Sequence, residues 1–464
     1  MLMKLKAEKF LRSVERIKLS DPSFFYIATS VSRLNSTKRN EITNFLRRSY
    51  LIVVLTILFQ QTFKLFFIFC AVHSKLLISF KFSKKEITTS KLYISHGTPR
   101  NLTAKKDIYY NIEKDLDSTF YYINHTRLID YFNLNIIKGM HKKNFIAPKV
   151  MSPSIFWSFI FNVIRGNFKL LLRCFKDLRT HDRKAALFLL KAQVSNKSYA
   201  NFMLFSNLKS QLTDKVIELN IPFEGHTFEI MILEKLSHKF KSVNLHQISP
   251  YTLASFEVKN KFRYWSDNNR KNWTLLVQNQ YSRKLVQEFG CKLSIKVKQI
   301  SIQKHHCFSK PKLNVYLIAP ENNKREVYKL LSPFAKGDFG SHDFIFWIRL
   351  HPEFPKSVRY YVLTYLIKRH KKVVIIKEPK DTDFCNSKFI ISSGSSVVIK
   401  GLRHGCTPIY WATNPCDNSN PFYLDRSLNN LSFKYPHLES ILAKANCLSD
   451  YKLNNLMKNH ATYL

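Results

Sequence analysis

Residues 344–354, FIFWIRLHPEF, run from apolar side chains to Arg349 and His351, and the rigid Pro352 follows them. Arginine presents a planar fork of N–H donors and histidine presents a further donor, so this pair suits a phosphate or diphosphate group. If the apolar run is a buried strand, both side chains lie at its carboxyl end, where open α/β sheets bind their ligands. A surface ion pair for Arg349 and a turn position for His351 are the plainer interpretations, and they stay open.

A second stretch, FIISSGSSVVIKGLRHG from residue 389, places a serine-rich turn between a strand and a helix. Ser395 and Ser396 stand directly before the expected helix. Serine hydroxyls and the unpaired amides of a helix start can bind an anion. In the same half of the chain this turn and Arg349 would converge on one phosphate, whereas a serine turn taken alone is most often a structural cap.

The third stretch, IPFEGHTFEIMILEKL at residues 221–236, carries two carboxylates. Glu224 lies in a loop between a proline and a glycine, where a carboxylate could remove a proton from an incoming hydroxyl. Glu229 lies in the first turn of the following helix and could have a secondary role. The alternative is that Glu224 is a solvated loop residue and Glu229 a helix acid stabilised by the dipole.

Short apolar runs alternate with helical stretches through most of the chain, which predicts α/β structure. Residues 91–97, 200–206, 241–247 and 273–279 are expected strands, and Gly290 is expected to end a helix that follows the last of them. From residue 312 the alternation is regular. We therefore expect an N-terminal domain over 86–308, a C-terminal domain over 309–464 and a basic extension over 1–85.

Two segments are candidates for contact with a membrane. Residues 51–72 are about as long as the ~20 residues that cross a bilayer, but Gln60, Gln61 and Lys64 weaken a spanning helix. An interfacial helix and a true span rank equally here, and a buried core helix ranks third. Residues 153–179 form a basic amphipathic helix that suits an anionic lipid surface; a surface helix packed on its own domain is the alternative.

The overall charge indicates an anionic partner, although the few glycines and abundant Lys, Asn, Ile and Phe are also typical of an AT-biased genome, which would account for part of the excess. The 464 residues include 74 Lys+Arg and 32 Asp+Glu, a formal net charge of +42, so nucleic acid, anionic lipid and phosphorylated substrates all fit. The eight cysteines show no zinc-ligand spacing, and we expect no metal site.

The order of FEGHTFE, then RLHP, then SGSS followed by a helix and GCTPI resembles the two-domain glycosyltransferases of bacterial surface carbohydrate synthesis. The resemblance is to the sialyltransferase and Kdo-transferase group that makes capsule and lipopolysaccharide, and it covers roughly residues 200–415. It implies a GT-B fold, in which two Rossmann-like domains face a central cleft, and an inverting, metal-independent transfer from a nucleotide-sugar. By the same resemblance His351, Ser395 and Ser396 contact the donor phosphate with Arg349 adding charge, and Glu224 is the general base.

Three departures from that pattern matter. Phe228 stands where related surface-carbohydrate sequences often have a tryptophan. Phe223 replaces a second carboxylate, and Lys400 stands where many members keep a glutamate that binds the donor ribose. Because a lysine cannot accept hydrogen bonds from ribose hydroxyls, a CMP-linked donor or a catalytically inactive scaffold of the same fold remains open.

The leading interpretation is thus an enzyme on the cytoplasmic face of the inner membrane, peripheral or with a single span. Its partners would be a nucleotide-sugar, a glycan or glycolipid acceptor and anionic lipid, with no nucleic acid. A nucleic-acid-binding protein is the rival, because it would use the positive charge directly.

Overall fold

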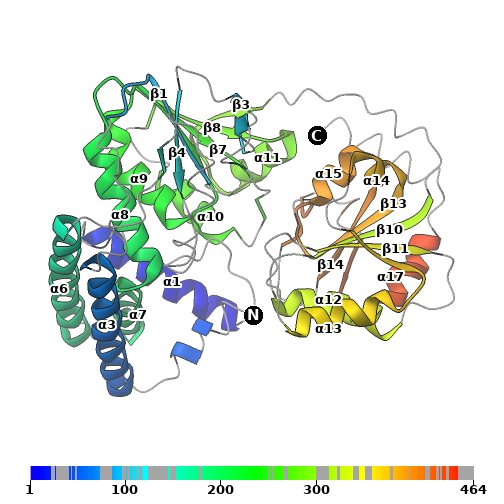
Figure 1. The fold of residues 1–464 in the computed structure, drawn as a ribbon, viewed down its shortest axis with the longest axis horizontal. Coiled ribbons are helices and arrows are strands. Elements are labelled where there is room, and N and C mark those ends of the chain that lie inside the picture. The colour runs from blue at the N-terminus through cyan, green and yellow to red at the C-terminus, as the bar shows by residue number, and fades with distance from the viewer. Residues whose placement is uncertain are drawn as a thin grey trace. The chain divides into compact units, whose positions relative to one another are not determined.

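The computed structural model divides the chain into two compact units (Figure 1). Unit 1 comprises Met1–Ile248, Phe256–Leu276 and Lys292–Ile295, and unit 2 comprises Ser249–Ser255, Val277–Cys291 and Lys296–Leu464. The structure describes residues 2–21, 24, 27, 41–42, 44–46, 50–73, 86–96, 101, 105–107, 109–110, 112–113, 118–123, 145–146, 153–176, 180–248, 251–252, 255–265, 270–298, 313–320, 324–337, 344–350, 358–376, 380–395, 397–412, 419–424, 428, 431–434 and 438–447.

Unit 1 is built on a seven-stranded sheet with the order β5-β4-β1-β6-β7-β8-β9. Its pairings from β5 to β8 are all parallel. The chain starts at β1, moves outward through β4 and β5, and then returns to the other side of β1 with β6, which is the doubly wound arrangement of a Rossmann-like domain. The strands are β1 Lys91–His96, β4 Ser118–Ile123, β5 Phe145–Ile146, β6 Glu218–Pro222, β7 Ser242–His246, β8 Trp273–Val277 and β9 Ser294–Val297. A separate small ladder pairs β2 Lys106–Asp107 with β3 Ile112–Glu113.

Most of the predicted elements of this half are confirmed. β1, β7 and β8 occupy three of the four expected strands, and helix α11 (Gln280–Glu288) follows β8. Gly290 follows the C-cap residue Phe289 with φ of 84°, the left-handed conformation that a terminating glycine supplies.

The expected strand at 200–206 is wrong, because these residues belong to helix α8 (Asn196–Gln211). Ser195 caps the helix by accepting a hydrogen bond from the Ser198 amide at 3.1 Å. The run FMLF is apolar enough for a strand by itself, but its burial continues at helical spacing from Tyr199 to Leu208. Periodicity over the longer window therefore outweighed the short apolar run.

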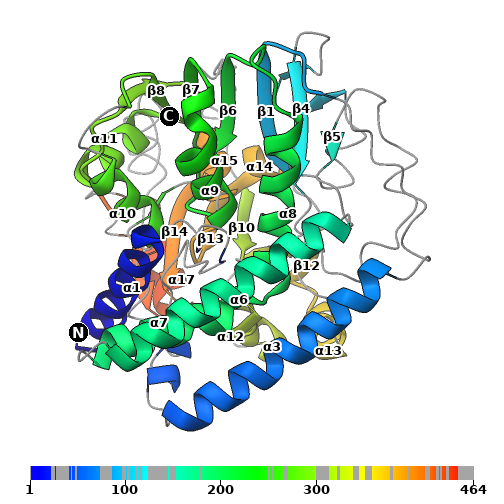
Figure 2. The same cartoon turned by 90° about the vertical axis from the view of Figure 1, so that its left-hand side faces the viewer.

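Helices cover the sheet of unit 1 and extend well beyond it. Helices α8 and α9 (Thr227–Leu236) lie side by side (Figure 2). The remaining helices are α1 Leu2–Ser20, α3 Tyr50–His73, α6 Pro153–Lys176, α7 Thr180–Gln193 and α10 Phe256–Tyr264. A buried ion pair joins Lys261 of α10 to Glu15 of α1 at 3.6 Å, so the first helix is bonded to this unit.

Unit 2 contains a six-stranded sheet with the order β12-β11-β10-β13-β14-β15, in which every pairing is parallel. The strands are β10 Leu313–Ala319, β11 Ile345–Arg349, β12 Val373–Ile376, β13 Ser387–Ser392, β14 Thr407–Ala412 and β15 Ser432–Lys434. The helices between and after them are α12 Lys324–Lys336, α13 Val358–Lys368, α14 Asp381–Asn386, α15 Val397–Arg403 and α17 Leu438–Asn446. The regular alternation read from the sequence is confirmed.

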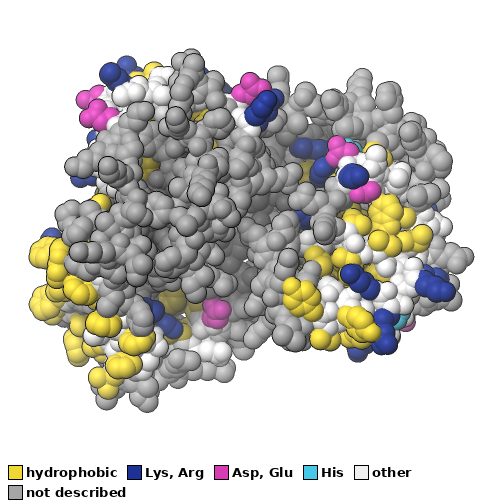
Figure 3. All heavy atoms as spheres, viewed as in Figure 1, with side chains coloured by type: hydrophobic (Ala, Val, Ile, Leu, Met, Phe, Trp, Pro, Cys, Tyr) yellow, Lys and Arg dark blue, Asp and Glu magenta, His cyan; other side chains and the backbone are white. Residues whose placement is uncertain are grey.

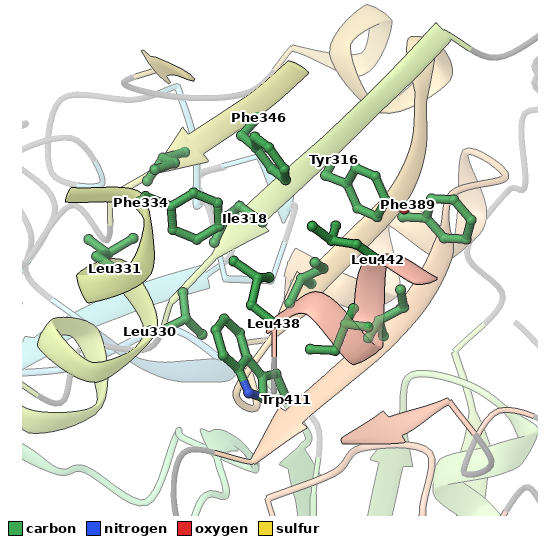
Figure 4. Close-up of a cluster of buried hydrophobic side chains, with 14 of the residues drawn as sticks. Tyr316, Ile318, Leu330, Leu331, Phe334, Phe346, Phe389, Trp411, Leu438 and Leu442 are labelled. Carbon is green, nitrogen blue, oxygen red and sulfur yellow. The ribbon is translucent and has the colours of Figure 1, made fainter. Parts of the chain in front are cut away.

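Apolar side chains cover both faces of this second sheet. On one face, Tyr316 and Phe389 stack with ring centroids 4.9 Å apart, within a cluster that also contains Trp411 and Leu442 (Figure 4). The opposite face packs against α14 and α15 through a second buried cluster. A parallel sheet buried on both faces explains why its strands are almost continuously apolar. The predicted fold class of two Rossmann-like α/β domains is confirmed.

Candidate functional site

Each sheet has one point where the strand order reverses, and the candidate residues gather at both. In unit 1 the reversal lies between β1 and β6, and in unit 2 it lies between β10 and β13. Loops at the carboxyl ends of such neighbouring strands diverge, so they leave a crevice in which α/β proteins bind ligands.

The loop between β6 and α9 carries Glu224 and is shaped by its two neighbours. Gly225 has φ of 82°, and a Cβ there would lie 2.9 Å from the Cβ of Glu257, so the turn requires glycine. Glu229 Oε2 accepts hydrogen bonds from the amides of Glu224, Gly225 and His226 at 2.8, 2.9 and 2.9 Å. One carboxylate oxygen thus fixes three consecutive residues of the loop.

Glu229 is completely buried, which separates its role from that of Glu224. Burial raises the pKa of Glu229 to about 8, against the opposing effects of His226 and the backbone donors. Its second oxygen, Oε1, has no hydrogen-bond partner among the described residues. Because Glu229 holds the loop from beneath and has no exposed surface, it is a positioning residue rather than a group that touches a substrate.

Glu224 lies at the edge beside two histidines. Its Oε2 is 3.3 Å from Nε2 of His226, and the two side chains are 21% and 33% exposed. The His226 ring stacks on Phe228 at 5.9 Å between centroids and meets His96, the last residue of β1, edge-on at 6.4 Å. A partly exposed carboxylate paired with an imidazole can accept a proton from a hydroxyl group.

His96 supplies a neutral imidazole to this edge. Burial lowers the pKa of His96 to about 4, so the ring is uncharged at neutral pH. It packs against Tyr109 at 4.9 Å between ring centroids. Buried Asp107 holds that segment in place, because its Oδ1 accepts from the amides of Tyr109 and Tyr110 at 3.0 and 3.1 Å.

Phe223 is part of the core rather than of the site. Its side chain is fully buried against Phe262 and Trp265, with ring centroids 5.5 and 5.0 Å away. A second carboxylate at this position would be buried among aromatic rings, which explains why this chain has an apolar residue there.

At the edge of unit 2, Arg349 and the serine turn lie on the two strands that flank β10. The register pairs Ile318 with Ile348, and Ala319 with Ser392. Arg349, one residue after Ile348, is therefore level with Ala319 and Ser392, and alternation places all three on one face of the sheet. The structure thus brings Arg349 and this turn to the same edge and the same face.

The turn itself is closed by one hydroxyl group. Ser392 Oγ accepts from the amides of Gly394 and Ser395 at 3.0 and 2.7 Å. The carbonyl of Ser395 accepts from the Val398 amide at 3.2 Å and begins α15. Ser393 is buried, and its Oγ has no hydrogen-bond partner among the described residues.

Two predicted site residues, His351 and Ser396, lie outside the described residues. Lys400 is described and is oriented toward α14: its Nζ is 2.7 Å from Asp381 Oδ1 and 5.1 Å from the centroid of the Phe384 ring. The lysine and its aspartate partner are both about half exposed. A carboxylate therefore stands beside the lysine that replaces the expected glutamate.

Three residues of these edges were not predicted as site residues, although the sequence contains signals for them. His96 is the last residue of the strand KLYISH, and His226 lies two residues after Glu224 in the loop FEGH, so both are polar residues at the carboxyl end of an apolar strand. Ser393 lies in the predicted serine turn, but only the structure shows that its hydroxyl lacks a described partner. Within the described part of the chain, no three His, Cys, Asp or Glu side chains are grouped as metal ligands.

No family model matches the sequence, and no curated protein matches it. Among solved structures, the chain is similar to a glycosyltransferase from Rickettsia africae ESF-5 at 12% identity, covering 81% of this chain and 94% of that chain with a TM-score of 0.40. It is also similar to UDP-GlcNAc 2-epimerase of Methanocaldococcus jannaschii in complex with UDP-GlcNAc and UDP, at 12% identity over 80% and 99% of the chains with a TM-score of 0.42. A third similar structure is UGT89C1 of Arabidopsis thaliana, at 12% identity over 79% and 93% of the chains with a TM-score of 0.39. At these identities and TM-scores the similarities carry no argument about the reaction.

Proposed function

We propose that the chain is a glycosyltransferase that moves a sugar from a nucleotide-activated donor to a glycan or lipid-linked glycan acceptor of a bacterial surface polysaccharide. The observation that carries this proposal is the division of chemistry between the two sheets. The reversal point of unit 1 holds a carboxylate paired with an imidazole, and the reversal point of unit 2 holds an arginine and a serine turn. Proton removal and phosphate binding are the two tasks of such a transfer.

In the proposed reaction Glu224 accepts the proton of the acceptor hydroxyl, and His226 supports the carboxylate. The acceptor oxygen then forms a bond to the anomeric carbon, while the bond from that carbon to the donor phosphate oxygen breaks. Because the attack comes from the side opposite the leaving group, the anomeric configuration inverts. The nucleotide leaves with its phosphate charge stabilised by Arg349 and by the hydroxyls of the serine turn, including Ser395.

Further parts of the proposal concern the donor and the role of a metal. In this proposal the leaving phosphate is stabilised by protein side chains of unit 2 without a bound metal ion. Lys400 lies on α15, the helix that follows the serine turn, and pairs with Asp381 of α14, so we place the ribose or base of the nucleotide near this pair. CMP-, UDP- and GDP-sugars are the donors to compare.

The test combines donor binding with turnover in the full-length protein. One of the three nucleotide-sugars should raise the melting temperature, because a ligand that binds only the folded state stabilises it. Glu224→Gln should keep this shift and lose roughly 100-fold to 10,000-fold in transfer or donor hydrolysis. Arg349→Met should weaken donor binding roughly tenfold or more, because it removes a charge-assisted hydrogen bond.

Matched controls are available on exposed parts of the chain. Glu288→Gln and Arg369→Met remove the same charges from exposed positions away from the two edges, and both should behave as the wild type. A protein that shifts with none of the three donors, or whose Glu224→Gln variant keeps full turnover, would refute the proposal. Donor binding without turnover would instead support the inactive scaffold.

A further inference from the structure

The largest concentration of exposed apolar side chains lies on α3 and α6. Of the eighteen large hydrophobic residues that are exposed in the described part of the chain, eleven belong to these two helices. They are Leu55, Phe59, Phe63, Phe66 and Phe69 on α3, and Trp157, Phe161, Ile164, Phe168, Leu172 and Phe175 on α6. The spacing within each set is three or four residues, so each helix presents one continuous apolar stripe.

The two stripes form a single surface because the helices lie side by side (Figures 1 and 2). Asn167 of α6 donates a hydrogen bond to Oε1 of Gln61 on α3 at 2.8 Å, and Phe69 meets Phe156 at 6.0 Å. In the space-filling view the hydrophobic side chains gather over these helices (Figure 3). Each helix has 24 residues and is therefore about 36 Å long.

Helix α3 buries a polar side chain and exposes apolar ones, the opposite of a helix that faces water. Gln61 is buried, and its amide donates to the carbonyl of Leu190 on α7 while it accepts from Asn167. Phe59, two residues away, is 74% exposed. Helix α3 thus turns its amide toward protein and its phenylalanines outward. A continuous patch of exposed apolar side chains is rare on a monomeric soluble protein and indicates an apolar partner.

The charge of the two helices indicates which kind of apolar partner they bind. Neither α3 nor α6 contains an Asp or Glu, whereas Lys64 and Arg165 are exposed beside the stripes. The whole chain adds a net charge of +42. Anionic lipid headgroups complement this distribution, and phenylalanine and tryptophan are suited to the region just beneath them.

The contacts on the other side of α6 determine how it meets the lipid. Lys169 pairs with Asp21 at 2.5 Å, and Arg173 donates to Ser20 Oγ at 2.8 Å, so the basic side of the helix is bonded to the end of α1. Gln193 of α7 donates to the carbonyl of Val163 at 3.0 Å. Although the segment Ile155–Phe175 is long and apolar enough to cross a membrane, protein covers one of its sides along much of its length. Because α1 and α7 hold α6 along one side, only its other side is open to lipid, and the helix would lie parallel to the membrane surface.

We propose that α3 and α6 together form one membrane-binding surface, which inserts side-on into a single leaflet of an anionic bilayer and does not span it. The inference goes beyond the proposed reaction. Its test measures binding to lipid, so the outcome is independent of whether the chain transfers a sugar.

The first experiment measures flotation of the full-length protein with vesicles of phosphatidylcholine alone and of phosphatidylcholine mixed with phosphatidylglycerol. We expect binding to both and stronger binding to the anionic vesicles. Phe59→Ser on α3 and Phe161→Ser on α6 should each weaken binding roughly tenfold, and the double variant roughly a hundredfold, because both side chains contribute buried apolar area to one surface. Both residues are exposed, so circular dichroism of the variants should match that of the wild type.

The matched control lies on α13 of unit 2. Tyr361 and Tyr365 are 57% and 63% exposed, so Tyr361→Ser with Tyr365→Ser removes two similarly exposed rings and should leave vesicle binding unchanged. If the control weakens binding as much as the Phe59→Ser and Phe161→Ser pair, the surface is not the binding site. If the wild type binds neither vesicle and the pair instead dissociates a dimer, a second copy of the chain covers the surface and the proposal is wrong.

Trp157 reports the depth of insertion, because it is the one exposed residue among the five tryptophans. Lipids brominated near the headgroup end of the acyl chain should quench its fluorescence more than lipids brominated near the far end, since an in-plane helix sits roughly 5 to 10 Å below the surface. Trp157→Phe should remove the quenching. Stronger quenching by the deep bromines would indicate a spanning helix and overturn the proposal.

Discussion

Glu229→Gln tests whether a buried, neutral carboxyl group holds the loop that carries Glu224. The glutamine has nearly the same shape, and its oxygen can accept the three amide hydrogen bonds that Glu229 Oε2 accepts from residues 224–226. Its NH2 group would occupy the place of Oε1, which has no partner among the described residues in the wild type. The substitution therefore changes the ability to ionise more than it changes the packing.

The magnitude follows from the pKa of Glu229, which burial raises from 4.5 to about 8. A raised pKa means that the folded protein favours the protonated form, so the stabilisation is complete below about pH 4.5 and is lost as the pH rises through about 8. Each pH unit in this window removes roughly 1.4 kcal/mol from the wild type and nothing from the glutamine variant. Between about pH 5 and about pH 8 the variant should gain on the order of 4 kcal/mol relative to the wild type.

Native-state hydrogen exchange of the full-length protein measures this difference locally. The opening free energies of amides in β6 and α9 are compared between variant and wild type at the same pH, so that the intrinsic exchange rates cancel. The exposed Glu288→Gln variant should follow the wild type at every pH. A difference that does not change with pH, or a variant that is less stable at the alkaline end, would show that the three amide donors outweigh burial and that Glu229 is ionised in the folded protein.

Three further substitutions probe contacts within unit 1 or within unit 2. Lys261→Met removes one positive partner of buried Glu15 and should destabilise unit 1 by about 3 to 5 kcal/mol, seen as faster tryptic cleavage within α1. Tyr110→Phe removes the 2.6 Å hydrogen bond to the carbonyl of Ile94 and should cost about 1 to 3 kcal/mol in urea unfolding, because that carbonyl is buried in β1. Lys400→Ala breaks a half-exposed ion pair and should change the free energy of unfolding by less than about 1 kcal/mol in urea. If the same variant also loses donor affinity, that loss comes from a lost contact with the nucleotide and not from unfolding.

The local elements could be predicted from the sequence where one pattern ran for long enough. The continuous apolar strands from β10 to β14 and the helices between them are confirmed, since burial on both faces leaves a strong signature. The segment at 200–206 was the failure: four apolar residues fit a strand and a helix equally well, and the helical burial from Tyr199 to Leu208 decided it.

The candidate site was predictable as a set of residues but not as a geometry. The sequence contains Glu224, Arg349 and the serines at strand ends, yet residues as far apart in the chain as His96 and His226 can be assigned to one edge only when the strand order is known. Similarly, the spacing of α3 and α6 indicates amphipathic helices but does not say which face is covered. Buried Gln61 and exposed Phe59 settled that question for α3.

The sequence by itself determined the parallel α/β class, the net charge and the residue types available for acid–base chemistry and phosphate binding, because these depend on composition and on local periodicity. Only the tertiary structure decided which strands flank each reversal point, that Glu229 positions the loop rather than reaching a substrate, and that two apolar stripes far apart in the chain form one surface. These properties depend on contacts between distant segments, and local periodicity contains no information about such contacts.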